Sequence, residues 1–219
     1  FPRTRVTVLW GMTEGGVTTC VSDSPWPKVR STCGIGLPGL ETRILGANGE
    51  TLPANAEGEL VMRGPGVFTG YVGQDDLYAS YLTPDGFFRT DDQATMDDEG
   101  YIRITGRIKD LIIRGGVNIS PVPIEDALAA HPNVASVAVV GLPDERLGER
   151  ICAVIEPRVR HPDLRELVEF ALSRGLPKYN CPEFLHIMDG MPRTPAGKIR
   201  KVDVKAIATR ALDSGGVSS

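Results

Sequence analysis

The segment Asp85-Gly-Phe-Phe-Arg-Thr-Asp-Asp92, continued by Gly106-Arg-Ile-Lys-Asp-Leu-Ile-Ile-Arg-Gly-Gly-Val-Asn118, separates two differently patterned parts of this chain. It places paired carboxylates, an arginine and a lysine around a short β-type pattern and ends in a two-glycine loop. Acidic and guanidinium groups beside a flexible junction suit a sugar or phosphate ligand held between two moving bodies. The segment therefore indicates a binding site rather than a core.

The part before this segment is patterned as strands. To about Gly106 the chain is rich in glycine and proline and carries short alternating runs, which is typical of strands joined by tight turns. We expect strands at 41–45 and 58–63, with Gly46-Ala-Asn-Gly49 as a hairpin-type turn. Two more short strands are expected at 101–105 and 111–114.

The part after Lys109 alternates helices and strands. Ser120 offers an N-cap oxygen and Pro121 suits a first helical turn, so a helix is expected to run to about Ala130. Apolar residues at helical spacing predict a second helix over 164–172, closed by Gly175. The remaining expectations are strands at 134–140, 151–155 and 184–188, and a polar, frayed tail from Asp213. Together these patterns predict the α+β fold class.

Composition limits the kind of protein this is. A chain of 219 residues with 41% apolar residues can bury a core, and its net charge of −4 argues against a nucleic-acid surface. The four cysteines have neither zinc-ligand spacing nor the density of a disulfide scaffold, so we expect a cytoplasmic location. The chain has no apolar run near the roughly 18 residues of a membrane span and no signal-peptide pattern at its N-terminus.

Two glycine motifs imitate nucleotide-binding signatures. Gly34-Ile-Gly-Leu-Pro-Gly39 matches the dinucleotide fingerprint in letters, but that motif needs a helix opening within the turn, whereas Pro38-Gly39 leads into an expected strand. Gly197-Lys198 lacks the first glycine and the following Ser or Thr of a phosphate loop. We interpret both as ordinary turns.

Three short motifs carry functional groups, and each also has a purely structural interpretation. Trp10-Gly-Met-Thr-Glu14 joins an aromatic ring, a hydroxyl and a carboxylate, which suit a purine, a phosphate and magnesium, or else form a buried tryptophan before a surface turn. Asp92 and Arg107 suit ribose hydroxyls, or else form a surface ion pair. The third, Met191-Pro-Arg-Thr-Pro-Ala-Gly-Lys198, presents one lysine on a loop, where most lysines are merely solvated.

Taken in order, these motifs resemble the acyl-adenylate-forming superfamily, which includes acyl-CoA and aryl-CoA synthetases, luciferases and carrier-protein adenylation domains. The resemblance runs from about Val6 to Lys205. It rests on Gly-Met-Thr-Glu14, Gly58-Glu-Leu with Gly64 and Gly70-Tyr71, Thr90-Asp-Asp92, Gly106-Arg-Ile-Lys-Asp110, Gly115-Gly-Val-Asn-Ile-Ser-Pro121, Leu142-Pro-Asp144 with Leu147-Gly-Glu149, and Pro192-Arg-Thr-Pro-Ala-Gly-Lys198.

The resemblance implies a nucleotide site in the first part of the chain. Trp10 would stack on adenine, with Gly11 and Met12 beside it in the same cofactor-binding motif. Thr13 would contact phosphate, and Glu14 would hold magnesium. ATP, Mg2+ and coenzyme A are the expected cofactors, and a small carboxylic acid is the expected substrate.

The resemblance also implies a moving second part. Asp92 and Arg107 would bind ribose, and Lys109 would be the hinge of a small C-terminal domain. Lys198 would reach the carboxylate and α-phosphate during adenylation, whereas Gly115-Gly116 would line the pantetheine tunnel after rotation. Residues 1–108 would then be the C-terminal remnant of the large AMP-binding domain, and 109–219 the small mobile domain.

The chain departs from the family pattern in three respects, one of which is Pro123 in place of a glutamate common near the start of the next helix. Thr90-Asp91-Asp92 replaces the usual Thr-Gly-Asp, and we assign the ribose contact to Asp92. The Ser/Thr/Gly-rich phosphate loop and most of the acyl pocket are missing, so we expect a C-terminal portion of a longer enzyme that is inactive by itself.

Three functions remain open. The first choice is an AMP-forming ligase that joins a fatty, alicyclic or aryl acid to coenzyme A. The second is an enzyme that loads such an acid onto a carrier protein. The third is a non-catalytic interaction module, against which the intact Glu14, Asp92, Arg107 and Lys198 argue.

Overall fold

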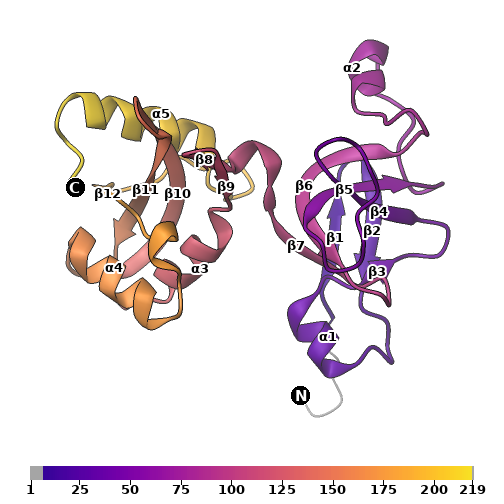
Figure 1. The fold of residues 1–219 in the computed structure, drawn as a ribbon, viewed down its shortest axis with the longest axis horizontal. Coiled ribbons are helices and arrows are strands. Elements are labelled where there is room, and N and C mark those ends of the chain that lie inside the picture. The colour runs from indigo at the N-terminus through magenta and orange to yellow at the C-terminus, as the bar shows by residue number, and fades with distance from the viewer. Residues whose placement is uncertain (1–6, 219) are drawn as a thin grey trace. The chain divides into compact units, whose positions relative to one another are not determined.

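The chain forms two compact units, Phe1–Ile108 and Lys109–Ser219, in a computed structural model that describes residues 7–218 (Figure 1). Both units combine small sheets with helices, which confirms the predicted α+β class. No helix among residues 7–218 has the length and hydropathy needed to cross a membrane.

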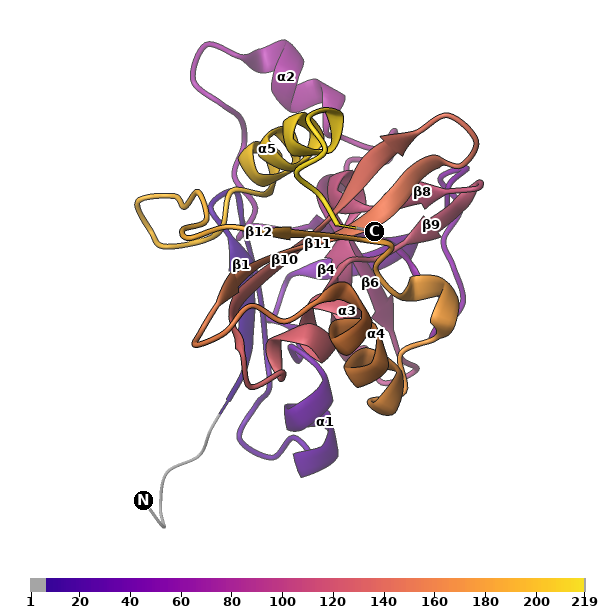
Figure 2. The same cartoon turned by 90° about the vertical axis from the view of Figure 1, so that its left-hand side faces the viewer.

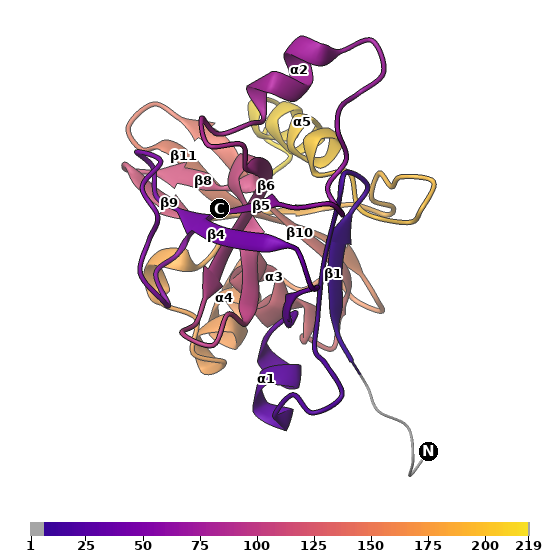
Figure 3. The ribbon, with the colours of Figure 1, turned by 90° about the vertical axis from the view of Figure 1, so that its right-hand side faces the viewer.

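The first unit contains two antiparallel sheets. The three-stranded sheet has the order β1-β2-β3, and the four-stranded sheet has the order β4-β5-β6-β7. Helices α1 and α2 lie at opposite ends of the unit (Figure 3). The elements are β1 (Leu9–Met12), β2 (Gly15–Thr19), α1 (Trp26–Ser31), β3 (Ile35–Gly36), β4 (Glu41–Leu45), β5 (Gly58–Arg63), α2 (Asp75–Ser80), β6 (Phe88–Met96) and β7 (Ile102–Arg107).

Several local predictions for this unit are confirmed. The strands expected at 41–45 and 58–63 have those bounds, and the Gly46 N–H donates to the Glu50 carbonyl at 2.8 Å to close the predicted turn. Residues 34–39 hold strand β3 and a turn in which the Leu40 N–H donates to the Leu37 carbonyl at 2.9 Å. Because no helix opens there, the glycine motif is a turn between strands, as predicted.

The four-stranded sheet is apolar on both faces. On one face Ile44, Leu60, Ala94 and Ile102 form a buried cluster with Cys33, against which Trp10 packs. On the other face Leu45 and Val61 pack on Phe87. Strand β6 alternates buried and partly buried residues, so its buried positions share the face of Ala94. Asp92 is one of these positions, and the sheet therefore turns its carboxylate inward.

The second unit is a sheet covered on both faces. Strand β11 lies between antiparallel β10 and parallel β12, and one end of β11 also pairs with the β8–β9 hairpin. The elements are η1 (Ile108–Asp110), which begins in the first unit, β8 (Ile112–Arg114), β9 (Val117–Ile119), α3 (Val122–Ala129), β10 (Val134–Asp144), β11 (Gly148–Pro157), α4 (Leu164–Ser173), η2 (Lys178–Asn180), β12 (Phe184–Ile187) and α5 (Lys201–Asp213).

Helices α3 and α4 cover one face of this sheet and α5 covers the other (Figure 2). Alternation along β10 explains the two cores. Val139 belongs to the core of Leu128 and Leu167, whereas Ala138, Val140 and Leu142 belong to the core beneath α5. Both faces of the β10–β11 pair are therefore apolar, and one packs against α3 and α4 while the other packs against α5.

Two predictions for this unit need correction, and one helix was not predicted. Pro121 rather than Ser120 is the N-cap of α3, and the hydrogen bond that the Ser120 hydroxyl accepts from the Val122 N–H is long, at 3.4 Å. Helix α5 was not predicted. Only Val204 and Ala208 of its 13 residues are buried, and Val202 is 79% exposed, so its apolar residues do not mark a single helical face. The tail is not frayed as far as Ser218, whose N–H donates to the Leu185 carbonyl at 3.1 Å.

Candidate functional site

Asp92 is the centre of a three-residue group in the first unit. It is 6% exposed, and its Oδ2 accepts a hydrogen bond from the Trp10 indole N–H at 2.9 Å. Its Oδ1 accepts from the Arg107 Nε–H at 2.9 Å, because the register of β6 and β7 places the two residues opposite each other. Both carboxylate oxygens are thus oriented by protein donors, and a carboxylate oxygen can accept more than one hydrogen bond.

The backbone around Asp92 explains which aspartate faces inward. The Thr90 hydroxyl donates to the Leu60 carbonyl at 2.7 Å and accepts from the Asp92 N–H at 3.1 Å, which locks both residues into β6. Asp91 lies between them at a φ of 60°, a left-handed conformation that favours glycine. This is the position at which the sequence resemblance expects glycine.

Thr13 and Glu14 form the turn between β1 and β2. The Tyr71 hydroxyl donates to Glu14 Oε1 at 3.0 Å, and the Glu14 carbonyl accepts from the Phe68 N–H at 2.8 Å. Partial burial and the Glu14 carboxylate raise the pKa of the Tyr71 hydroxyl, so it remains a protonated donor at neutral pH. Thr13 is exposed at this turn.

The rest of the first motif precedes this turn on β1. Gly11 is exposed and Met12 is half-buried there. The Glu14 side chain is hydrogen-bonded to Tyr71, whereas Asp92 is hydrogen-bonded to Trp10 and Arg107. The structure therefore brings the predicted ribose pair together with Trp10, and leaves Glu14 with Tyr71.

A metal site made by protein side chains alone is absent from residues 7–218. No cluster of three or more His, Cys, Asp or Glu side chains with suitable geometry occurs in this range. Mg2+ is commonly held by one or two carboxylates together with substrate phosphates. The single carboxylate of Glu14 fits that arrangement, in which the nucleotide supplies the remaining ligands.

Lys198 lies on an exposed loop of the second unit. The loop closes on itself, because the Thr194 N–H donates to the Lys198 carbonyl at 2.8 Å and the Lys198 N–H donates to the Thr194 hydroxyl at 3.2 Å. Among the described residues, the Lys198 side chain takes part in no hydrogen bond or ion pair. An organised backbone thus carries an amine available to a ligand.

Gly115 and Gly116 form the turn of the β8–β9 hairpin. Arg114 pairs with Val117, and the two glycines between them have φ values of 59° and 81°. A two-residue hairpin with positive φ at both positions strongly prefers glycine. A β-carbon on Gly116 would have no atom within 4 Å, so the space beside it is open.

An ion cluster holds the base of this hairpin. The Arg114 guanidinium donates to Glu183 through Nε at 2.9 Å and Nη2 at 3.0 Å, and Arg150 Nε donates to the same carboxylate at 3.1 Å. The hydrogen bonds from Arg114, opposed by burial and supported by Arg150, lower the pKa of Glu183 to about 2. Glu183 is therefore ionised at physiological pH.

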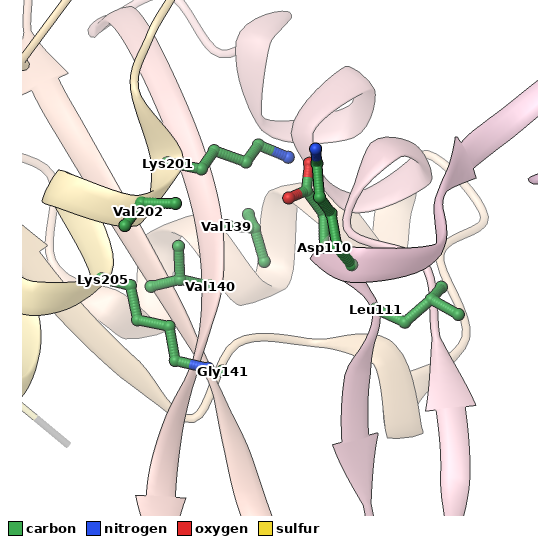
Figure 4. Close-up of a pocket in the computed structure, with 9 residues that line it drawn as sticks. Asp110, Leu111, Val139, Val140, Gly141, Lys201, Val202 and Lys205 are labelled. Atoms are coloured by element: carbon green, nitrogen blue, oxygen red, sulfur yellow. The ribbon is translucent and has the colours of Figure 1, made fainter. Parts of the chain in front are cut away.

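Lys109 lies in η1 and lines a cavity of about 70 Å³ in the second unit, beside Asp110 and α5 (Figure 4). Lys201 and Lys205 also line it, but Lys201 pairs with Glu125 at 2.8 Å and Lys205 with Glu149 at 2.5 Å. A space of this size holds about two water molecules. Both helix lysines that line the cavity are thus neutralised by ion pairs within the second unit.

Sequence reasoning paired Asp92 with Arg107, but it did not predict the hydrogen bonds of Glu14 to Tyr71 or of Asp92 to Trp10. Tyr71 lies within a quoted motif, yet its bond to Glu14 crosses 57 positions. The Trp10 bond to Asp92 crosses 82 positions. Both pairings depend on how the sheets assemble, and a single sequence carries no signal for them.

Comparison with known proteins identifies the family of this chain. The model described as AMP-binding enzyme matches residues 1–72, and the one described as AMP-binding enzyme C-terminal domain matches residues 123–198. The medium-chain fatty-acid–CoA ligase of Escherichia coli is 40% identical over 207 residues, which are 93% of this chain and 37% of the relative.

Two further relatives point the same way. The salicyl-AMP ligase/salicyl-S-ArCP synthetase of Mycobacterium tuberculosis is 38% identical over 194 residues, which are 88% of this chain and 34% of the relative. The crystal structure of ATP-bound MatB from Rhodopseudomonas palustris superposes with a TM-score of 0.85 at 32% identity, covering 94% of this chain and 41% of that one. The chain thus spans about two fifths or less of each relative, and it belongs to the AMP-binding enzyme family, whose C-terminal region it matches.

Proposed function

We propose that this chain is part of an AMP-forming acid–thiol ligase. In the first half-reaction a carboxylate oxygen of the acid attacks the α-phosphorus of ATP, and diphosphate leaves. In the second, a thiolate sulfur attacks the acyl carbon of the acyl-AMP, and AMP leaves. The observation that carries the proposal is the unpaired Lys198 amine at the end of an organised loop, in a chain that also holds the Asp92 group.

Asp92 suits the ribose of the nucleotide. Its buried carboxylate is fixed from both sides by Trp10 and Arg107, and the lone pairs that remain match the two hydroxyls of a ribose ring. Trp10 is only partly buried, so its ring keeps exposed surface for contact with a base. Thr13 and Glu14, at a turn of the same sheet as Trp10, would serve the phosphates and Mg2+. When bound, Mg2+ would offset phosphate charge.

Lys198 suits the transition state of adenylation. Two anions must approach when a carboxylate attacks a phosphate, so a cation between them lowers the barrier more than it lowers the ground state. At a separation of about 4 Å and an effective dielectric constant of about 20, one ammonium contributes on the order of 4 kcal/mol, or about a thousandfold in rate.

The Gly115-Gly116 turn suits the arm of a thiol acceptor. Neither glycine presents a side chain, and the open space beside Gly116 would admit a slender pantetheine arm. Coenzyme A is our first choice of acceptor, in keeping with the similarity to a fatty-acid–CoA ligase. A carrier protein is the alternative, favoured by the similarity to an enzyme named for salicyl-S-ArCP synthesis.

The test uses a full-length enzyme, by which we mean a protein of the relatives' length that carries this chain. We expect exchange of labelled diphosphate into ATP that depends on an added carboxylic acid, measured over fatty, alicyclic and aryl acids. The same enzyme is then given coenzyme A or a pantetheinylated carrier protein, and thioester is quantified. Faster thioester formation with the carrier protein would replace the first choice by the alternative, and no exchange with any acid would refute the proposal.

A further inference from the structure

Arg193 joins the Lys198 loop to the sheet beneath it. Its Nη1 donates to the carbonyl of Gly197, the residue before Lys198, at 3.1 Å. Its Nη2 donates to the Ser136 hydroxyl on β10 at 2.7 Å and to Glu156 Oε2 on β11 at 3.1 Å. One planar guanidinium therefore spans from the loop to two neighbouring strands, a geometry that suits arginine and not lysine.

Glu156 anchors both Arg193 and the start of the loop. Its Oε1 accepts the Met191 N–H at 2.5 Å while Oε2 accepts from Arg193. Burial opposes ionisation of Glu156, but hydrogen bonds from Ser136, Met191 and Arg193 outweigh it and lower the pKa of the carboxyl. Its side chain is 17% exposed, so the pair with Arg193 is less screened than most surface ion pairs.

The ends of the loop are held by other means. Met191 is buried in the core beneath α5, and Ile199 packs against the same core. Residues 195–198 between them are exposed. Arg193 connects this exposed turn to the sheet, because it donates to the Gly197 carbonyl in the turn and to Ser136 and Glu156 on the strands. Loss of Arg193 should thus release the turn without emptying the core.

We infer that Arg193 is a positioning residue for Lys198, a role that rests on the proposed function. It makes its contact one peptide unit from Lys198 and fixes the direction in which the amine leaves the loop. A displacement of about 1 Å in a reacting group can cost about a hundredfold in rate. Arg193 thereby acts on adenylation through Lys198 and has no contact with the reacting atoms.

The test measures both half-reactions of the full-length enzyme. Arg193→Ala should lower kcat for acid-dependent diphosphate exchange by roughly tenfold to a hundredfold. The KM for ATP and thioester formation from supplied acyl-AMP should change less than threefold. Arg193→Lys should restore part of the rate, because an ammonium can bond to one acceptor but cannot span all three. Arg193→Ala with Lys198→Ala should be no slower than Lys198→Ala alone.

Two controls separate this role from general loss of structure. Arg165→Ala removes an exposed arginine that pairs with Glu169 at 2.8 Å on α4, and it should leave both half-reactions unchanged. Amide hydrogen exchange over 193–199 should accelerate in Arg193→Ala, whatever reaction the enzyme performs.

The outcomes distinguish the two proposals. Equal losses in both half-reactions, or a full exchange rate in Arg193→Ala, would overturn the positioning role while the proposed function stands. Unchanged amide exchange over 193–199 would also overturn it. Absence of acid-dependent diphosphate exchange in the unaltered enzyme would refute the proposed function, and the positioning role with it.

Discussion

At the scale of single residues, the environment of Asp92 decides what its carboxylate can do. A carboxylate that is 6% exposed needs hydrogen-bond donors, and Trp10 and Arg107 supply one to each oxygen. Removing either partner would leave one buried carboxylate oxygen without that donor, and removing Arg107 would also take away the positive charge that pairs with Asp92. The same contacts keep the carboxylate from turning, so a ribose would meet acceptors that are already in place.

Asp91 should lower the stability of this region, because its φ of 60° costs a residue with a β-carbon more than it costs glycine. We expect Asp91→Gly to raise the free energy of unfolding by about 0.5 to 1 kcal/mol, after the entropy that glycine adds to the unfolded chain. Urea denaturation of the variant measures this change. Affinity for ATP should stay the same, since Asp92 keeps its partners.

Asp91→Ala is the matched control for that substitution. It removes the charge, which repels the half-buried Glu59 carboxylate, but keeps the β-carbon. If Asp91→Ala stabilises the protein as much as Asp91→Gly does, charge and not backbone conformation is the cause.

At the scale of elements, the β8–β9 hairpin depends on the ion cluster around Glu183. Arg114 belongs to β8 and Arg150 to β11, so the Glu183 carboxylate ties two strands that share one register pair, Gly148 with Arg114. A single register pair contributes little by itself to holding the hairpin against β11. The side-chain cluster thus determines how firmly the Gly115-Gly116 turn is held.

This cluster should make the protein less stable as the pH is lowered. The pKa of Glu183 is depressed to about 2 from an unfolded value of 4.5, so its contribution is complete above about pH 4.5 and disappears as pH falls toward 2. Glu183→Gln should cost on the order of 2 kcal/mol at pH 7, a value discounted because 21% of the side chain is exposed. The two proteins should converge in urea midpoint near pH 2.

Glu169→Gln provides the comparison for Glu183→Gln. Its carboxylate pairs with Arg165 on the exposed face of α4, where an ion pair contributes about 0 to 1 kcal/mol. A gap between the Glu183→Gln protein and the unaltered one that persists undiminished at pH 2 would contradict the electrostatic account of the hairpin.

How well an element could be predicted depended on how its apolar residues are spaced. Strands β4 and β5 have the expected bounds, because each contains a short run of apolar residues and has a glycine at or next to at least one of its ends. Strand β6 buries Thr90 and Asp92 at inward positions, so its alternation is hidden in the sequence. Helix α1 opens with Trp26-Pro27 and spans six residues, which is too short for a helical period to show.

At the scale of the whole molecule, the chain carries its functional groups on both units. The Asp92 group belongs to Phe1–Ile108 and the Lys198 loop to Lys109–Ser219. Lys109 begins the second unit. We propose that it is the hinge about which Lys198 and the Gly115-Gly116 turn exchange places.

Lys109→Pro tests the hinge. Proline fixes φ near −65° and removes the backbone N–H, so the variant should hold one conformation at the boundary. We expect diphosphate exchange to stay within a few fold of the unaltered enzyme, whereas thioester formation from supplied acyl-AMP falls by at least tenfold. Lys109→Ala is the control, because it removes the same side chain without fixing the backbone, and it should leave the thioester step largely intact. Collapse of the exchange step in Lys109→Pro would show that the hinge lies elsewhere.

The order of the motifs identified the site residues, but it predicted only one of their contacts. Asp92 and Arg107 could be paired in advance because both lie in short motifs that the resemblance joins. Ser136 and Glu156 lie 57 and 37 positions from Arg193 and outside every quoted motif. The hydrogen bonds by which Arg193 links the Lys198 loop to the sheet were therefore visible only in the fold.

The most direct measurement compares Lys198→Ala with Lys178→Ala in the full-length enzyme, in both half-reactions. Lys178 lies in η2 of the same unit and provides a matched lysine-to-alanine change outside the Lys198 loop. Lys198→Ala should lower acid-dependent diphosphate exchange by about a thousandfold and largely spare thioester formation from supplied acyl-AMP, while Lys178→Ala changes neither. Equal losses in the two half-reactions of Lys198→Ala, or an exchange rate that survives the substitution, would contradict the account.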